Sequence, residues 1–415
     1  MRILLVATRH PYGRTTGRKV VLKTIIRSCL DLGHDVRVVA ITDESQPPGP
    51  VPVEVIAPPG LPRVAVNVMA KASTGKLCLN ECLYVSPAIT AAIREVCATT
   101  HVDVVIADMV RTSSLALATG LPTVVDLDDL LSRRYAALAE GRAEAGTVLG
   151  YYGRMIPRVV RRVASRLAAR LVGVEARLVS RREEAVGRAA GAVSLVAEDE
   201  AAAFTRSIGR PVAWLPMAID IPPEPAPVAS NDGRRIVFVG GLDYHANLEA
   251  VRMYVDQVAP SIAALGVDGL RLRVIGHCPE PVRVELGSSS AVELVGYVDD
   301  LASELAGARA FVAPIPPGTG VKTKVLEAMA AGLPVVSTPD GVHGIGAVDG
   351  HHCIIGSTGD ELARGVVALV GDPGAAADMG AAARALVEEV FSPVVVAERW
   401  RAVLESLPLR SEPTQ

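Results

Sequence analysis

The chain has 415 residues, too many for one hydrophobic core, and this length predicts two domains of about 200 residues each. Half of the residues are hydrophobic and 21% are charged, which is typical of globular proteins and excludes a disordered chain. A net charge of −3 and an aromatic content of 3% argue against a nucleic-acid-binding protein, which needs basic and stacking surfaces. No apolar run reaches the roughly 18 residues that span a membrane, and residues 1–7 are too short for a signal peptide. We therefore expect a soluble, cytoplasmic protein.

Apolar runs alternate with helical patterns along the first half of the chain. The runs that we expect to form strands are residues 3–7, 36–41, 53–57, 102–107, 123–127, 192–197 and 212–217. The first predicted helix, residues 19–32, carries its apolar side chains at helical spacing. Continuous apolar strands between helices predict an α/β protein with a parallel sheet that is covered on both faces. Ligands bind such sheets at the carboxyl ends of the strands.

Three loops follow these strands and meet at that edge of the sheet. They carry the polar residues His10, Asp108, Arg111, Asp126, Asp128 and Asp129, together with Gly13. Carboxylates directly after a buried strand can orient sugar hydroxyls or bind a divalent ion. The alternatives are that Asp128 or Asp129 caps the next helix, and that His10 forms hydrogen bonds within its own loop.

Residues 154–188 form a helical, arginine-rich segment. A basic amphipathic helix can lie on an anionic membrane. However, Glu175, Glu183 and Glu184 dilute its charge, and no Trp or Phe anchors it. We expect a solvated face, with peripheral contact to the inner membrane face as the alternative.

The proline-rich residues 221–233 predict a linker, after which the alternation resumes. The strands expected in the second half are residues 236–239, 272–275, 292–295, 310–315 and 335–338. Asn247 is the expected N-cap of the helix that follows the first of them. No GxGxxG follows any of these strands, which argues against a dinucleotide enzyme.

The Pro/Gly loop before the helix expected at residues 323–331 carries the strongest signal for a site. A helix N-terminus attracts anions, and Gly318 and Gly320 let the backbone approach a ligand closely. Lys322 and Lys324 add positive charge, and Glu327 lies where its carboxylate can accept from a vicinal diol. A phosphate site beside a diol site indicates a nucleotide. The alternative is a glycine-rich turn that binds nothing.

The cysteines and histidines do not predict a metal site. Cys78 and Cys82 are near neighbours, but no second pair completes a zinc site, so we expect reduced thiols on one helix face. His351, His352 and Cys353 are adjacent, and adjacent residues of a strand point to opposite faces.

The run from Gly320 to Thr338, which ends in VLEAMAAGLPVVST, resembles the donor-site signature of GT-B retaining glycosyltransferases of the GT4-like group (glycosyl transferases group 1). The resemblance implies that Glu327 hydrogen-bonds the ribose of the donor. The first Glu of the family signature falls on Thr319 in this sequence. The Arg and Lys with which many relatives hold the diphosphate fall on Gly241 and Ala246.

The fold implied by this resemblance is α/β, with two Rossmann-like domains whose parallel sheets face each other across a cleft. Residues 1–217 would form the acceptor domain and residues 218–393 the nucleotide-sugar donor domain. Residues 394–415 would form a terminal helix that returns to the first domain.

The function implied is transfer of a sugar, with retention, from a nucleotide-diphosphate sugar to an acceptor hydroxyl in polysaccharide, glycoconjugate or natural-product synthesis. The expected partners are a nucleotide-sugar donor and an unidentified acceptor, without nucleic acid, metal ion or other cofactor. The candidate catalytic residues are Asp108, Asp128 and Lys322. The candidate acceptor-side residues are His10, Gly13, Arg111, Asp126 and Asp129. The candidate donor-binding residues are Gly240, Gly241, Gly276, Tyr297, Gly318, Thr319, Gly320, Val321, Lys322, Lys324 and Glu327.

Two other classes of function stay open. One is a sugar-nucleotide epimerase or a phosphorylase on the same fold, which would need no separate acceptor alcohol. The other is a non-catalytic nucleotide-sugar-binding subunit, which the departures at Thr319, Gly241 and Ala246 suggest.

Overall fold

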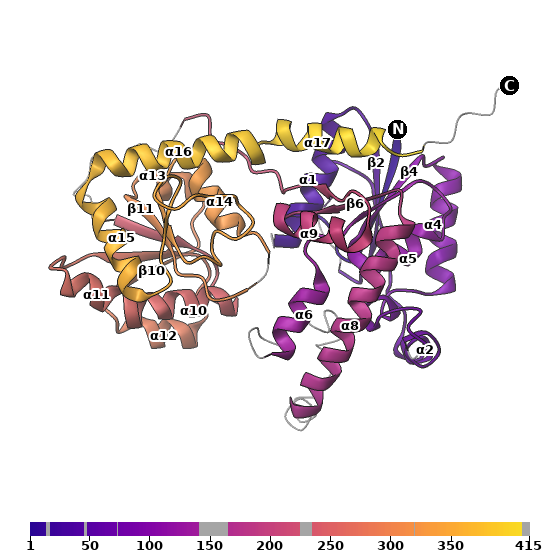
Figure 1. The fold of residues 1–415 in the computed structure, drawn as a ribbon, viewed down its shortest axis with the longest axis horizontal. Coiled ribbons are helices and arrows are strands. Elements are labelled where there is room, and N and C mark those ends of the chain that lie inside the picture. Colours follow the sequence, from indigo (N-terminus) through magenta and orange to yellow (C-terminus); the bar gives the residue numbers. More distant parts are fainter. Residues whose placement is uncertain are drawn as a thin grey trace. The chain divides into compact units, whose positions relative to one another are not determined.

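The computed structural model describes residues 1–13, 17–44, 48–72, 74–140, 165–224, 235–318 and 320–408, with only the backbone of residues 165–171. The chain divides into two compact units, each built around one parallel sheet (Figure 1). Unit 1 comprises Met1–Ala218 and Val396–Gln415, and unit 2 comprises Ile219–Val395.

The sheet of unit 1 has seven strands in the order β3-β2-β1-β4-β5-β6-β7. Its strands are β1 (Arg2–Ala7), β2 (Asp35–Ile41), β3 (Val53–Ile56), β4 (Val104–Asp108), β5 (Thr123–Asp126), β6 (Ala192–Leu195) and β7 (Ala213–Trp214). Every side chain of β4 and β5 is buried, as a parallel sheet between helices requires. Burial of each large apolar side chain contributes about 1.5–3 kcal/mol, so these central strands form the core of the unit.

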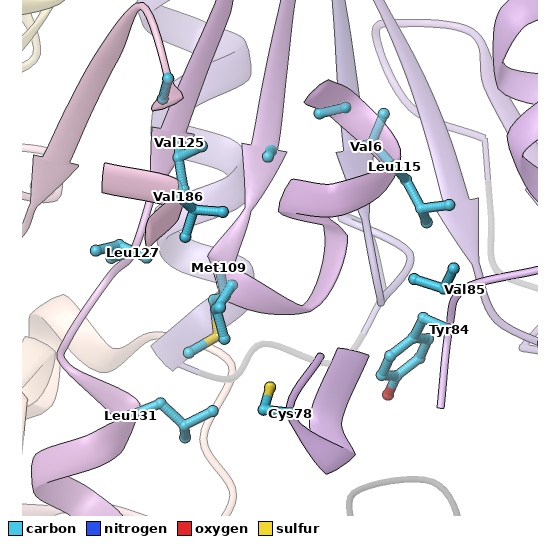
Figure 2. Packing of buried hydrophobic residues seen from close by; sticks show 14 of the residues in the cluster. Val6, Cys78, Tyr84, Val85, Met109, Leu115, Val125, Leu127, Leu131 and Val186 are labelled. Atoms are coloured by element: carbon cyan, nitrogen blue, oxygen red, sulfur yellow. The ribbon is translucent and has the colours of Figure 1, made fainter. Parts of the chain in front are cut away.

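The helices of unit 1 are α1 (Gly17–Asp31), α2 (Leu61–Asn67), η1 (Val68–Ala72), α3 (Leu79–Cys82), α4 (Pro87–Thr99), α5 (Met109–Leu117), α6 (Leu131–Ala139), α8 (Ser165–Ala189), α9 (Glu198–Ile208) and most of α17 (Pro393–Glu405). Figure 2 shows part of the cluster in which α5 and α8 pack on the sheet, with Leu115 and Val186 buried together with Val6 and Val125. The terminal helix α17 packs on unit 1 through Arg399, whose guanidinium lies 4.1 Å from the ring centroid of Trp214.

The sheet of unit 2 has six strands in the order β10-β9-β8-β11-β12-β13. Its strands are β8 (Arg235–Val239), β9 (Arg271–Ile275), β10 (Val292–Gly296), β11 (Ala310–Ala313), β12 (Val335–Ser337) and β13 (Ile354–Ile355). Its helices are α10 (His245–Met253), η4 (Tyr254–Val258), α11 (Ala259–Ala264), α12 (Glu280–Gly287), α13 (Leu301–Ala306), α14 (Thr323–Ala330), α15 (Gly359–Gly371) and α16 (Pro373–Phe391).

The predicted α/β class and the predicted strands are confirmed, and strand β13 is the one strand of the described residues that the sequence did not predict. The prediction that Asn247 caps a helix is wrong. Helix α10 begins two residues earlier, at His245, with Tyr244 as its N-cap. The side chain of Asn247 instead donates to the carbonyl oxygen of Gly241 at 2.8 Å and so ties the helix to the loop after β8.

The six cysteines are free, and Cys78 is the N-cap of α3 rather than a member of its face. Within the ranges given above, no helix combines the length and the apolar character that crossing a bilayer demands. The structure describes the basic segment 154–188 only from residue 165 onward. The membrane contact predicted for this segment therefore stays a prediction.

Candidate functional site

Glycine-containing loops close the carboxyl edge of the unit 2 sheet. Backbone hydrogen bonds join them, from the N–H of Gly240 to the carbonyl of Ile275 at 2.8 Å and from the N–H of Gly276 to the carbonyl of Gly296 at 2.7 Å. Gly276 has a φ of +141°, and a Cβ atom there would lie 2.7 Å from the carbonyl carbon and oxygen of Gly240. Only glycine allows the two backbones to come this close, so the peptide groups at Gly240 and Gly276 carry no side chain of their own.

The next loop along this edge leads from β11 into α14. Lys322 is the N-cap of α14 and forms no side-chain cap, while its ammonium group donates to the carbonyl of Gly320. No acidic residue lies in the first turn, so the positive end of the helix dipole is not neutralised locally. Gly320 has a φ of +77°, and the N–H of Gly318 donates to Asp340 at 3.2 Å. Thr319 lies outside the described residues.

Lys324 extends from α14 to the end of β8. Its Nζ atom donates to the side-chain oxygen of Asn247 and lies 4.7 Å from the ring centroid of Phe238. A Cβ atom on Gly240 would lie 2.7 Å from this Nζ, so the absence of a side chain at Gly240 leaves room for the lysine. Burial lowers the pKa of Lys324 to about 7, with Glu327 raising it and Lys322 lowering it further. A bound anion would favour the charged form of this amine and raise its pKa again.

Glu327 lies on the same helix, one turn beyond the loop. The residue is exposed, yet partial desolvation of its carboxylate raises the pKa above the ordinary value, and Lys324 opposes this rise. Val321 lies in the loop that precedes α14, and Tyr297 follows β10 with 82% of its surface exposed. The structure thus brings Gly240, Gly276, Lys324 and Glu327 to one edge of unit 2.

A buried ion-pair network closes the corresponding edge of unit 1. The guanidinium of Arg18, on α1, donates from Nε to Asp108 at 2.6 Å and from Nη2 to Asp126 at 2.9 Å. These two aspartates are paired neighbours at the ends of β4 and β5, so one guanidinium spans both strands. Burial alone would raise the pKa of Asp108, but Arg18 and the backbone N–H of Thr8 hold it below the ordinary value.

Asp128 is the third carboxylate around this guanidinium, 3.4 Å from Nη1 of Arg18, and its side chain keeps 16% of its surface exposed. Desolvation raises the pKa of Asp128 to about 7; Arg18 opposes this rise, and the charges of Asp129 and Asp126 add to it. Its φ of +64° is uncommon for a residue with a side chain, and such strain is typical of functional sites.

Asp129 forms a bidentate ion pair with Arg134, with Nη2 at 2.6 Å from Oδ1. Helix α6 begins after Leu130, its N-cap, and no side chain caps it. The alternative in which Asp128 or Asp129 caps that helix is therefore wrong.

The other acceptor-side candidates lie apart from Arg18. Arg111, on α5, donates from Nε to Oδ1 of Asn80 at 3.2 Å. His10 is buried and accepts from the backbone N–H of Tyr12 at 3.3 Å, so it does form a hydrogen bond within its loop. Burial lowers the pKa of His10, and Lys19 lowers it further. Gly13 has a φ of +91° in the same loop.

Sequence reasoning missed Arg18 and Asn80, and it assigned Asn247 to a helix cap rather than to its contacts with Gly241 and Lys324. Arg18 lies 90 residues from Asp108 along the chain, and only the packing of α1 against the sheet brings them together. In the part of the chain that the structure describes, no group of three or more His, Cys, Asp and Glu residues could hold a metal ion.

Comparison with known proteins gives a match for unit 2. Residues 233–372 match the family model for glycosyl transferases group 1, and these residues contain the whole edge described above. No sequence among the curated proteins matches the chain with significance.

Solved structures resemble the chain over nearly its whole length. HepE of Anabaena, crystallised with UDP, has a TM-score of 0.64 at 14% identity, over 98% of this chain and 100% of that one. Sucrose-phosphate synthase of Thermosynechococcus elongatus has a TM-score of 0.63 at 15% identity, over 97% and 98% of the two chains. The chain has the GT-B fold. A mutant of S. aureus TarM, in complex with fondaparinux, alpha-GlcNAc-glycerol and UDP, has a TM-score of 0.64 at 8% identity, over 97% and 99%.

Proposed function

We propose that the protein is a glycosyltransferase that moves a sugar from a nucleotide-diphosphate sugar to an acceptor hydroxyl. The observation that carries this proposal is the glycine-lined edge of unit 2, into which Lys324 extends from α14. Peptide N–H groups, a helix N-terminus and one buried amine are the groups that bind a diphosphate. The match of the same residues to the glycosyl transferases group 1 model supports this function.

The nucleotide is proposed to lie with its diphosphate at Lys324 and its ribose at Glu327. Lys324 would take the place of the Arg and Lys that the family signature has at Gly241 and Ala246. HepE of Anabaena has been crystallised with UDP and with UDP-glucose, so a uridine nucleotide is the first one to test.

In transfer, negative charge develops on the leaving diphosphate as the bond to the sugar breaks. Positive groups that are already in place stabilise this charge more than they stabilise the substrate, and this difference accelerates the reaction. In the proposal Lys324, Lys322 and the N-terminus of α14 supply that charge, without a resident metal ion or cofactor. Retention of configuration is the outcome that the resemblance implies.

The carboxylates of unit 1 are proposed to serve the acceptor in two different ways. Asp108 is 0% exposed and held by Arg18 and Thr8, which suits a positioning role. Asp128 is partly exposed, and with a pKa of about 7 it can accept a proton near neutral pH. Asp128 is therefore our first candidate for a direct contact with the acceptor hydroxyl.

The test is the thermal stability of the protein with UDP, GDP, dTDP, ADP and CDP. A ligand at 100 times its dissociation constant stabilises the folded state by about 2.7 kcal/mol. We expect one diphosphate to raise the melting temperature of the wild type and of Glu389→Ala, an exposed control on α16. The rise should be smaller for Glu327→Ala. If no diphosphate stabilises the wild type, the proposed donor site is wrong.

A further inference from the structure

Two guanidinium groups at the carboxyl edge of the unit 1 sheet form no ion pair with a carboxylate of the described residues, although the charge of Asp108 acts on one of them, Arg9. Arg9 follows β1, is half-buried, and forms neither a hydrogen bond nor an ion pair with any described residue. Arg111 lies in the first turn of α5 and is 5% exposed. The partners that its guanidinium has there, Asn80 and Tyr135, are neutral.

The two arginines are neighbours because of the strand order. Strands β1 and β4 pair in parallel with Val6 beside Ala107, so the residues that follow each strand lie side by side. A hydrogen bond of 3.1 Å from the backbone N–H of Thr8 to Asp108 joins the two chain segments that carry Arg9 and Arg111. Desolvation lowers the pKa of Arg9, the charge of Arg111 lowers it further, and the charge of Asp108 opposes this lowering.

The acids of this edge are engaged elsewhere. Asp108 and Asp126 bind Arg18, and Asp129 binds Arg134. Glu175 accepts from the backbone N–H groups of Leu79 and Asn80 and from the Asn80 side chain. Asp108 acts on Arg9 through its charge, but neither Arg9 nor Arg111 has a carboxylate in ion-pair contact among the described residues. An anion that contacts both guanidiniums would therefore be stabilised there.

Helix α5 adds to this preference. Its N-cap, Asp108, forms no side-chain cap, so the positive end of the helix dipole lies at Arg111. The first residue of the helix, Met109, has a φ of +62° although it is not a glycine. Strained backbone conformations such as this one cluster at ligand-binding and active sites, and here the strained residue lies next to Arg111.

We propose that Arg9 and Arg111 bind a phosphate monoester group carried by the acceptor. The three oxygens of a phosphate monoester can accept from two guanidiniums at once, and its dianion attracts both more strongly than a carboxylate does. Arg9, the more exposed of the two, makes the direct contact, with Arg111 behind it. This inference rests on the proposed glycosyltransferase function and names the chemical class of its acceptor as a phosphorylated alcohol.

The test measures the stability of the protein with inorganic phosphate at constant ionic strength, after saturation with the diphosphate that stabilises it best. Saturation fills the donor site, so that phosphate reports on a second site. We expect millimolar phosphate to raise the melting temperature of the wild type and of Arg206→Gln, which removes an exposed arginine of α9. Arg9→Gln should bind phosphate at least tenfold more weakly, and Arg9→Lys should recover part of the loss.

Three results would overturn the proposal. The first is an equal phosphate response of the wild type and Arg9→Gln, and the second is no response of the wild type. The third is an equal response to acetate, which would indicate a site for anions in general. The response of Arg9→Gln to the diphosphate must stay unchanged, which shows that the variant folds. Failure with phosphate but success with the diphosphate rejects the acceptor class alone. If no diphosphate stabilises the protein, phosphate is titrated without it, and a response that Arg9→Gln lacks then rejects the donor site alone.

Discussion

The two sheets end in edges of opposite chemistry, although both are parallel and both belong to Rossmann-like units. The unit 1 edge is made of charged side chains, and Arg18 alone joins the ends of two strands through Asp108 and Asp126. The unit 2 edge is made largely of peptide groups, with glycines where the loops approach each other and the ammonium groups of Lys322 and Lys324 among them. At the first edge Arg18 forms ion pairs with the carboxylates within the protein, whereas the second edge offers a ligand mainly backbone groups and the ammonium groups of Lys322 and Lys324. The same fold thus carries a network of side-chain ion pairs at one sheet edge and glycine-containing loops with lysines at the other.

The largest effect should come from removing the shared cation of unit 1. Arg18→Met leaves Asp108 and Asp126 buried without their shared ion-pair partner, and we expect a loss of about 3–5 kcal/mol in the free energy of unfolding. Urea denaturation measures this loss. The control is Arg401→Met, which breaks the exposed pair with Glu398 and should cost less than about 1 kcal/mol. Equal costs for the two variants would show that the unit 1 network does not hold its edge together.

Adding one methyl group tests the bare backbone of unit 2. Gly276→Ala places a Cβ atom 2.7 Å from the backbone of Gly240 at a φ of +141°. The strain should cost about 1–3 kcal/mol, and displacement of the two loops should abolish diphosphate binding. The matched control is Gly287→Ala at the end of α12, where no atom lies within 4 Å of the new Cβ. Normal binding by Gly276→Ala would contradict the role of these loops.

Removing the amine tests the charge of the unit 2 edge. Lys324→Met should weaken diphosphate binding by about tenfold to a hundredfold, because a hydrogen bond to a charged group contributes about 1.5–3 kcal/mol. Folding stability should change little, because the loss of the contacts with Asn247 and Phe238 is offset by relief of the desolvation that lowers the pKa of the amine. Calorimetric titration gives the affinity, with Lys76→Met of unit 1 as an exposed control. Unchanged affinity would assign the diphosphate to other groups.

The same amine should make binding depend on pH. Its ordinary pKa of 10.5 is lowered to about 7 in the free protein, and a diphosphate raises it again by favouring the charged form. Binding should therefore take up a proton above pH 7, and the affinity should fall by at most about tenfold per pH unit from pH 7 to 9. Titrations in two buffers of different ionisation heat measure the uptake. Lys324→Met, measured in parallel, removes the contribution of the ligand's own titration, and equal uptake by both proteins would refute the assignment.

The features that could be predicted from the sequence are those that depend on residues close together in the chain. Apolar runs located the strands of both units, and Gly318, Lys324 and Glu327 marked the turn and helix of the nucleotide edge. Partners distant in the chain were not predictable, because no local pattern shows that Arg18 reaches Asp108 or that Lys324 reaches Asn247, 77 residues away. The incorrect N-cap at Asn247 has the same origin, since the side chain is engaged by Gly241 and Lys324.

The most direct test of the account is hydrogen exchange, measured by mass spectrometry, with and without the diphosphate that stabilises the protein best. Peptide groups that bind a ligand exchange more slowly, so the measurement locates the nucleotide along the chain. We expect protection of residues 240–242, 276–277 and 316–327, the loops of the unit 2 edge. Protection confined to the unit 1 edge, around residues 108–128, would contradict the account and place the nucleotide on the other sheet.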